Sequence, residues 1–334
     1  MIILGIETSC DETAAAVLLK DQKGIQILSN VVASSASLQA KYGGIIPEQA
    51  AREQFKSIIP VINEALEQAN IKPEDLDAIA VTYGPGLIGS LLVGVETAKT
   101  LAKIWEKPLI PINHLLGHFY ANWINTTPPD FPCLGLLVSG GHTDLVLFTN
   151  HNKYEYLGGT RDDAAGECFD KCARLLGLPY PGGPQISEIA QNGDPDRFKL
   201  PIPMKNSKDL DFSYSGLKTA VANMVHSGQF TDNSKADLAA SLEKTIIQSL
   251  IDKITLALKK YPVKSVTVAG GVAANRKLVD RLQLTVNSIN PKINLHIPPP
   301  NLCTDNGAMI ASAGFFTKPI KNLTSVQADP NLTL

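Results

Sequence analysis

Two segments of this chain share one pattern: an apolar strand, a short turn rich in Ser, Thr and Gly, and a second apolar strand. The first covers residues 2–17, with ETSCDE in the turn, and the second covers residues 134–147, with SGGHTD in the turn. Turns of small polar residues let backbone N–H groups and hydroxyls converge on an anion. Either segment alone is also compatible with an ordinary β-hairpin, because Gly-rich turns are common. Their recurrence predicts two similar lobes, each with a phosphate-contacting hairpin, around a nucleotide cleft.

The expected fold is α/β. The repeated hairpin resembles the actin, sugar kinase and heat-shock ATPase superfold, in which two related lobes are built on mixed sheets. A chain of 334 residues with 44% hydrophobic and 19% charged residues is large enough to form two such lobes. We expect a first lobe over residues 1–112, to which residues 314–334 return, and a second lobe over residues 113–313 that contains the metal and nucleotide motifs.

Apolar runs and turn signals predict the order of elements along the chain. In the first lobe we expect strands at 2–6, 14–19, 25–33, 78–82 and 109–112, and helices at 47–70 and 87–105. In the second lobe we expect strands within 134–157, several helices between 165 and 260, and a βαβ unit over 263–297. Pro60 is expected to kink the first long helix.

Charge and cysteine content limit the class of protein. The net charge of −2 provides no overall basic field, so nucleic-acid binding would need a local patch or a partner. The five cysteines are scattered and odd in number, which argues against a disulfide framework. Cys168 and Cys172 stand four residues apart on a predicted helix, where core packing is favoured over metal binding. With no leader or membrane span expected, the cytoplasm is the predicted location.

A candidate metal site follows the strand at 109–112. If Asn113 caps a helix, His114 and His118 lie on one face with the spacing that can chelate one ion, although a partly buried helix face is the alternative. Asp305 precedes another apolar helical run and could be a helix cap or a third ligand. Two His and one carboxylate suit Fe(II) or Zn(II). Leu115 follows the first His, so the HExxH pattern of metalloproteases is missing.

Two further motifs suggest nucleotide binding. Residues 269–275, AGGVAAN, place two glycines between a strand and a helix, which is typical of a platform for a purine or a ribose. Residues 160–174 include Asp170, which could bind ribose hydroxyls if the helix faces a cleft. A solvated amphipathic helix is the alternative for this segment.

Several motifs occur in the order found in one family. They are GIETSCDETAAAV, YGGIIPE, GPGLIGSLLVG, NHLLGH, LVSGGHTD, DDAAGECFDK, YPGGP, FSYSGLKTA, AGGVAAN and CTDNGAMIA. Together they resemble the TsaD-type tRNA threonylcarbamoyladenosine biosynthesis proteins, a family once labelled O-sialoglycoprotein endopeptidase. The resemblance covers residues 3–313. The endopeptidase label has no support in the motifs.

The resemblance implies transfer of an L-threonylcarbamoyl group from threonylcarbamoyl-AMP to N6 of adenosine 37 in tRNAs that read ANN codons, with release of AMP. It implies that His114, His118 and Asp305 hold a divalent metal, with Fe(2+) expected and Zn(2+) or Mg(2+) as alternatives. The residues implied to bind the adenylate are Leu137, Val138, Ser139, Gly140 and Gly141 for its phosphate and acyl part, and Asp170, Gly183 and Asn275 for its nucleoside.

The first hairpin of the family lies near the reacting centre, so Asp11 and Glu12 are the candidates for acid–base or positioning roles. The donor is already an activated acyl phosphate anhydride, so the protein has mainly to orient it and to polarise its carbonyl. The adenine amine is a poor nucleophile, and a carboxylate could accept its proton during attack. The sequence does not rank Asp11 against Glu12.

Three positions depart from the family pattern. Gln54 stands where many relatives have His, and Ser187 stands where some have Asp. Leu137 stands where archaeal and eukaryotic relatives have a metal-side Tyr, which favours the bacterial form.

The resemblance also implies partners besides tRNA and the adenylate: a shorter paralogue of the same fold (TsaB-like) and a P-loop ATPase (TsaE-like). It implies no association with a membrane. We expect the paralogue on the helices at 47–68 and 87–103. A sugar- or acetate-type kinase or a chaperone-like ATPase is the alternative function, but neither explains the His pair with Asp305. A non-catalytic subunit would be expected to lack HLLGH and CTDN, and both are present.

Overall fold

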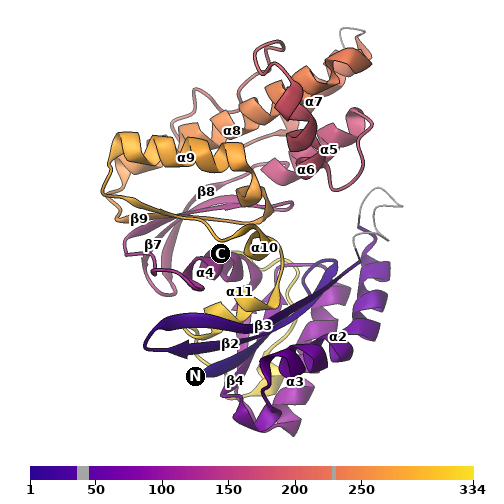
Figure 1. The fold of residues 1–334 in the computed structure, drawn as a ribbon, viewed down its shortest axis with the longest axis vertical. Coiled ribbons are helices and arrows are strands. Elements are labelled where there is room, and N and C mark those ends of the chain that lie inside the picture. The colour runs from indigo at the N-terminus through magenta and orange to yellow at the C-terminus, as the bar shows by residue number, and fades with distance from the viewer. Residues whose placement is uncertain (36–44, 228–230) are drawn as a thin grey trace. The chain divides into compact units, whose positions relative to one another are not determined.

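Two five-stranded sheets with the same topology form the framework of the protein (Figure 1). The computed structural model describes residues 1–35, 45–227 and 231–334. The first three residues of the YGGIIPE motif, 42–44, lie outside the described residues. The chain divides into unit 1, residues 1–128 with 301–334, and unit 2, residues 129–300.

The sheet of unit 1 has the strand order β3-β2-β1-β4-β5. Its strands are β1 (Ile2–Glu7), β2 (Glu12–Asp21), β3 (Gly24–Ser34), β4 (Ala78–Gly84) and β5 (Leu109–Asn113). The first three strands form an antiparallel meander, and β1, β4 and β5 run parallel. The parallel pairs are connected through helices, as parallel strands require.

Four helices within the described residues accompany this sheet. They are α2 (Pro47–Ala69), α3 (Ile88–Ile104), α4 (His114–Tyr120) and α11 (Gly307–Gly314). Leu4 and Ile6 of β1 belong to the apolar core that includes residues of α2 and α3. Gly5 points to the opposite face, where a Cβ atom would lie 2.3 Å from the carbonyl oxygen of Gly307, so a glycine is needed for α11 to pack there. Helix α2 continues through Pro60 without a break.

The sheet of unit 2 repeats the scheme in the order β10-β9-β6-β7-β8. Its strands are β6 (Cys133–Val138), β7 (Thr143–Asn150), β8 (Lys153–Gly159), β9 (Ser265–Ala269) and β10 (Asn294–His296). Here β6, β7 and β8 form the meander, while β6, β9 and β10 run parallel. The duplicated α/β fold expected from the two hairpins is confirmed.

The helices of unit 2 are α5 (Ala165–Leu175), α6 (Gly182–Ile189), α7 (Ser215–His226), α8 (Lys235–Lys260) and α9 (Arg276–Ile289). Short α10 (Pro300–Cys303) spans the boundary between the units. Single 3₁₀ turns occur at Pro73–Asp75, Ala121–Trp123, Ala190–Asn192, Asp232–Ser234, Gly271–Ala274 and Leu323–Ser325. Among the described residues, no helix combines the length and apolar character needed to span a membrane.

The division of the chain differs from the expected boundaries at 112 and 313. Residues 113–128 and 301–313 lie in unit 1, because α4 follows β5 directly and α11 packs against the unit 1 sheet. All three candidate metal ligands therefore belong to unit 1, and the nucleotide motifs after residue 128 belong to unit 2.

Candidate active site

The two candidate His ligands are placed by the start of helix α4. Asn113 is the N-cap, and its side-chain oxygen accepts hydrogen bonds from the backbone N–H groups of Leu115, at 2.8 Å, and Leu116, at 3.4 Å. His114 is thus the first residue of the helix and His118 lies one turn later on the same face. Their ring centroids are 4.7 Å apart.

Asp305 completes a group of three potential ligands. Its Oδ1 atom lies 3.2 Å from Nε2 of His118 and 3.6 Å from Nε2 of His114. One ligand atom from each residue lies within 4.8 Å of the others. Both His side chains are buried and the Asp305 side chain is 19% exposed. The cap of α11 is Asn306, whose Oδ1 accepts from the N–H of Met309 at 3.0 Å, so capping does not occupy Asp305.

A buried carboxylate supports His114 from behind. Oε2 of Glu7, which is fully buried at the end of β1, lies 3.0 Å from Nδ1 of His114. Glu7 also accepts hydrogen bonds from the N–H of Ser9 and the hydroxyl of Thr82. This leaves Nε2 of His114 directed at Asp305. A carboxylate that holds the far nitrogen of a ligating imidazole is the usual outer partner of a metal site.

The donor set fits a divalent transition metal. Two imidazole nitrogens and a carboxylate oxygen converge, and Glu7 orients one of the rings. Burial disfavours the charged form of His114, but the carboxylates of Glu7 and Asp305 outweigh it and raise its pKa to about 9. The two carboxylates of Glu7 and Asp305 beside the His114 imidazole therefore attract positive charge to this position.

Glu7 was not singled out from the sequence. A charged residue at the end of the buried strand IILGIE was the available signal, since an ionised side chain is rarely buried without a partner.

The turn of the first hairpin lies in the electrostatic field of Asp305. Burial, followed by the charges of Asp305 and Asp11, raises the pKa of Glu12 to about 9. The thiol of Cys10 has its pKa raised well above the usual value, first by burial and then by Asp305. Asp11 is buried, and its backbone oxygen accepts from the hydroxyl of Ser35 at 2.9 Å. The structure thus brings Glu12, one of the two candidate acid–base residues, near the candidate ligand Asp305, and Asp11 lies next to it in the same turn.

Gln54, one of the departures from the family pattern, holds this turn in place. Its Nε2 atom lies 2.8 Å from the carbonyl oxygen of Glu12 and 3.1 Å from that of Cys10. The side chain of Gln54 is buried. An amide donor at this position of α2 therefore fixes the backbone of the hairpin, a role that the sequence alone did not reveal.

In unit 2, the turn between β6 and β7 is closed by its own hydrogen bonds. The N–H of Ser139 donates to the carbonyl oxygen of His142 at 2.8 Å, and the Ser139 hydroxyl accepts from the N–H of His142 at 3.1 Å. No heavy atom among the described residues lies within 4 Å of where a Cβ would stand on Gly140 or Gly141. The turn therefore presents backbone groups next to open space.

The other members of this segment can act only through the backbone. The side chains of Leu137 and Val138, at the end of β6, are fully buried. Gly270 approaches them closely: its φ is +91°, and a Cβ there would lie 2.4 Å from the carbonyl oxygen of Val138. Only glycine adopts this conformation without strain and allows the approach.

Asp170 is used as an anchor for a helix. Its Oδ1 atom accepts from the N–H groups of Gly182, at 2.7 Å, and Gly183, at 3.3 Å, at the start of α6. Burial raises the pKa of Asp170, and these hydrogen bonds oppose the rise. On the same helix, Lys171 pairs with Asp163 at 2.6 Å and with Glu167 at 2.9 Å.

Cys168 and Cys172 are buried, with their sulfur atoms 4.0 Å apart. Within residues 1–35, 45–227 and 231–334, no third metal-ligating side chain is grouped with them.

Asn275 is fixed by a polar cluster that the sequence did not predict. Its Nδ2 donates to Oγ of Ser187 at 2.9 Å and to Oε1 of Glu243 at 2.7 Å. Its Oδ1 caps α9 by accepting from the N–H of Leu278 at 3.0 Å. Glu243 is buried and pairs with Lys277 at 2.7 Å. Glu243 stands directly before Lys244 in α8, so the local sequence gave no signal that this carboxylate would be buried.

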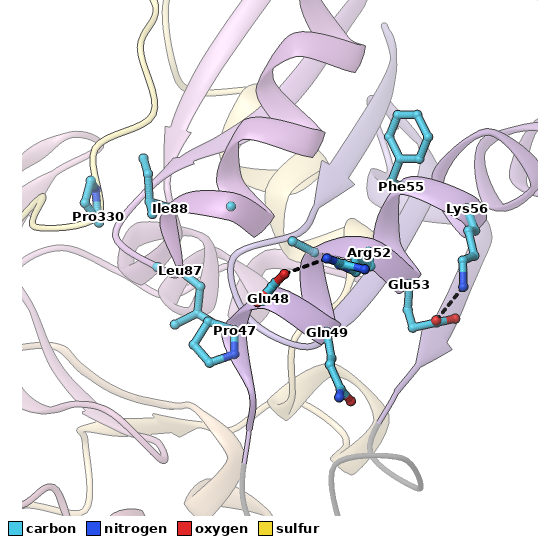
Figure 2. A pocket seen from close by; sticks show the side chains of 13 residues that line it. Pro47, Glu48, Gln49, Arg52, Glu53, Phe55, Lys56, Leu87, Ile88 and Pro330 are labelled. Carbon is cyan, nitrogen blue, oxygen red and sulfur yellow. Dashed lines mark hydrogen bonds and ion pairs between the residues drawn. The ribbon is translucent and has the colours of Figure 1, made fainter.

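A groove in unit 1 lies between the first turns of α2 and α3 (Figure 2). It is lined by residues 47–49, 51–53, 55–56, 86–89 and 330. Phe55 is 76% exposed and Ile88 is 49% exposed. Charged pairs border the apolar residues, including Arg52 with Glu48 at 2.6 Å.

The two sheets and their connections define the class: a two-lobed α/β protein of the actin-like ATPase fold. A solved structure of HypF from T. kodakarensis matches 94% of this chain and 47% of that chain with a TM-score of 0.60 at 15% identity. Component A of the (R)-2-hydroxyglutaryl-CoA dehydratase of Acidaminococcus fermentans matches 94% of this chain and 97% of that chain with a TM-score of 0.53 at 18% identity. At these identities, the likeness shows the fold alone.

The family is defined by closer relatives. The model of the family TsaD, tRNA N6-adenosine threonylcarbamoyltransferase, matches residues 26–312. The chain is 50% identical over 318 residues to the tRNA N6-adenosine threonylcarbamoyltransferase of Symbiobacterium thermophilum, covering 94% of this chain and 91% of that protein. It is 47% identical to the protein of the same name from Thermosipho africanus over the full length of both. The chain belongs to the TsaD family of tRNA N6-adenosine threonylcarbamoyltransferases.

Proposed function

We propose that this chain transfers the L-threonylcarbamoyl group from threonylcarbamoyl-AMP to N6 of adenosine 37 in tRNAs that read ANN codons. In this reaction a bond forms between N6 and the carbamoyl carbon, the bond from that carbon to the phosphate oxygen breaks, and AMP and one proton leave. Near-full-length relatives that bear the name of this transferase support the reaction. The convergence of His114, His118 and Asp305 is the structural observation that carries the proposal.

The metal role is assigned to these three side chains, with Fe(2+) as the proposed ion. Imidazole nitrogen suits Fe(2+) and Zn(2+), whereas Mg(2+) prefers oxygen ligands. A divalent ion bound there would polarise a carbonyl oxygen as a Lewis acid. Glu7 holds Nδ1 of His114, so that Nε2 faces Asp305.

We assign proton transfer to the pair Asp11 and Glu12. At neutral pH a carboxyl group with a pKa of about 9 keeps its proton, so Glu12 by itself is a hydrogen-bond donor. The negative charges of Asp305 and Asp11 contribute to the raised pKa of Glu12. A positive charge near Asp305 would offset them and so favour the ionised form of Glu12. An ionised Glu12 with high proton affinity would be a competent base for the adenine amine.

The adenylate is assigned to unit 2. Space is open around the Cα atoms of Gly140 and Gly141, so a phosphate could approach the backbone of this turn, with the Ser139 hydroxyl beside it. Leu137 and Val138 would take part through their backbone, since their side chains are buried. The nucleoside is assigned to Asp170, Gly183 and Asn275. These residues are hydrogen-bonded to other parts of unit 2. We therefore expect them to shape the nucleoside subsite as well as to contact the nucleoside.

The test is mass spectrometry of tRNA nucleosides after incubation with ATP, threonine, bicarbonate, the adenylate-forming enzyme and the presumed partners. Threonylcarbamoyladenosine should appear with the intact chain. In E12Q, which keeps the shape of the side chain but removes its ionisation, we expect turnover to fall about 100-fold or more while adenylate binding is retained. Normal turnover of E12Q would leave Asp11 as the base, and ATP hydrolysis by the lone chain without modification would favour the kinase or ATPase alternative.

The groove on α2 and α3 is the proposed docking surface for a shorter paralogue of the same fold. Phe55, Ile59, Ile88 and Leu92 are large apolar side chains that are 45–76% exposed on these two helices, which is the sign expected of an interface. A P-loop ATPase is the second proposed protein partner, and the cytoplasm, where tRNA is modified, is the proposed location. F55E should abolish co-elution with the paralogue, whereas L284E, which alters an exposed residue of α9, should leave it intact.

A further inference from the structure

Both segments that hold the candidate metal ligands are anchored by an asparagine N-cap. Asn113 comes before His114, and Asn306 comes after Asp305. The amide group of Asn306 is satisfied locally, because its Nδ2 donates to the carbonyl oxygens of Thr304, at 2.7 Å, and Leu302, at 3.4 Å. The NH2 group of Asn113 instead bonds to a residue far away in the sequence. Its Nδ2 donates to the carbonyl oxygen of Thr333, at 3.0 Å, across 220 residues of sequence.

The segment that supplies this oxygen lies across the end of β4. The N–H of Asp329 donates to the carbonyl oxygen of Tyr83 at 2.8 Å, and the N–H of Gly86 donates to that of Pro330 at 3.4 Å. A Cβ on Gly84 would lie 2.0 Å from the carbonyl oxygen of Asp329, so the chain packs directly on this glycine. We call residues 329–333 the strap. Figure 1 marks the C-terminus beside α4, in agreement with the bond to Asn113.

We infer that the strap positions the metal-binding helix through Asn113. An amide side chain caps a helix only when its oxygen, and not its NH2 group, faces the N-terminus. The Thr333 carbonyl accepts from the NH2 group and so selects the orientation in which Oδ1 faces Leu115 and Leu116. Asn113 is therefore a positioning residue for His114 and His118. The strap holds Asn113 in the orientation that caps the helix.

The effect should reach the ligands because His114 is the first residue of the helix. Loss of an N-cap destabilises the first turn of a helix, and α4 has only seven residues over which to compensate for it. A frayed first turn would move the His114 ring away from Glu7 and Asp305, to which it is now directed. This inference rests on the proposed metal site, and its test is chosen to separate the two.

The experiment uses two variants of the full chain that disturb the same bond from opposite sides. In N113S, an oxygen able to cap is kept, but the donor to Thr333 is lost. In G84A, Asn113 is unchanged, but the added methyl group displaces the strap at Asp329. G216A is the matched control, since no heavy atom among the described residues lies within 4 Å of its added Cβ. Co(2+) is the probe, followed by its visible absorption and by calorimetric titration, together with hydrogen exchange of the α4 amides.

We expect the affinity for Co(2+) to fall about 10-fold in both variants, in the range seen when partners that orient ligands are removed. The Co(2+) absorption band should shift, and the amides of residues 117–120 should exchange faster, while G216A behaves as the parent chain. Unchanged exchange and affinity in both variants would overturn the inference. If the parent chain binds no Co(2+) while exchange still accelerates in both variants, the strap stands as the anchor of α4 and the proposed metal site fails.

Discussion

The candidate metal centre in unit 1 and the nucleotide motifs in unit 2 use their polar side chains in different ways. In unit 1, Nε2 of His114 and of His118 converges on Asp305, and the supporting bonds are made by other atoms and residues. In unit 2, the side chains of Asp170 and Asn275 are already hydrogen-bonded within the protein. Asp170 accepts from the start of α6, and Asn275 donates to Glu243. The metal centre of unit 1 is therefore preorganised by side chains. The nucleotide motifs of unit 2 offer a ligand mainly backbone groups, with open space at Gly140 and Gly141.

This difference predicts that single substitutions affect the two regions unequally. Removing a side chain in unit 1 should change the affinity for metal directly. In unit 2 the same kind of change should act first on stability and on the shape of the backbone.

The largest effect is expected from H118A. This substitution removes one of three ligands at a buried position, so the affinity for Fe(2+) or Co(2+) should fall by more than the roughly 10–100-fold caused by loss of an outer partner. Metal content after purification and titration with Co(2+) give the measurement. H226A, at an exposed position near the end of α7, should retain the metal. Equal metal content in the two variants would remove the distinction between the regions.

The next effect is expected from E7Q, which keeps the shape of the Glu7 side chain but removes its charge. The imidazole of His114 would lose its carboxylate partner, and the affinity for metal should fall about 10–100-fold. E64Q changes an exposed glutamate of α2 and serves as the control in the same titration. An unaltered affinity in E7Q would show that Glu7 only fills space at the end of β1.

In unit 2, G270A should act on stability before it acts on binding. A residue other than glycine at a φ of +91°, with its Cβ 2.4 Å from the Val138 oxygen, should cost about 1–3 kcal/mol in the free energy of unfolding. Denaturant unfolding measures this cost, and a binding assay should show weaker binding of the adenylate. Metal affinity should not change. If the metal affinity of G270A falls as far as that of E7Q, the metal centre and the nucleotide motifs do not respond independently to substitution.

The smallest effect on activity is expected from the double variant C168A/C172A. Each substitution removes one buried sulfur atom from the core and should cost about 1 kcal/mol of stability. Metal content and transferase activity should stay at the level of the parent chain. Loss of metal from this variant would revive the alternative that the two thiols are ligands.

Much of the framework could be predicted from sequence because it follows from local patterns. The two hairpins predicted two related sheets, and the spacing of His114 and His118 predicted a shared helix face. The boundary between the units could not be placed in this way. It depends on α11 packing against β1, where Gly5 leaves room for it, and packing between segments some 300 residues apart leaves no periodic signal.

The missed residues are those that act through others. Glu7, Gln54 and Glu243 are buried polar residues, and each one forms hydrogen bonds to partners far away in the sequence. The strap is a short polar segment without a motif, and its contribution is a backbone carbonyl oxygen. No residue type marks such a contribution, so only the folded chain reveals it.

The most direct test of the central claim uses preformed threonylcarbamoyl-AMP, tRNA and the presumed partner proteins, with H114A and the parent chain compared after metal removal and after addition of Fe(2+). The account predicts that the parent chain loses the transfer of threonylcarbamoyl to tRNA when stripped and regains it with Fe(2+), while H114A neither binds the ion nor transfers the group. Full transfer by the stripped parent chain, or by H114A, would contradict a metal centre built from His114, His118 and Asp305.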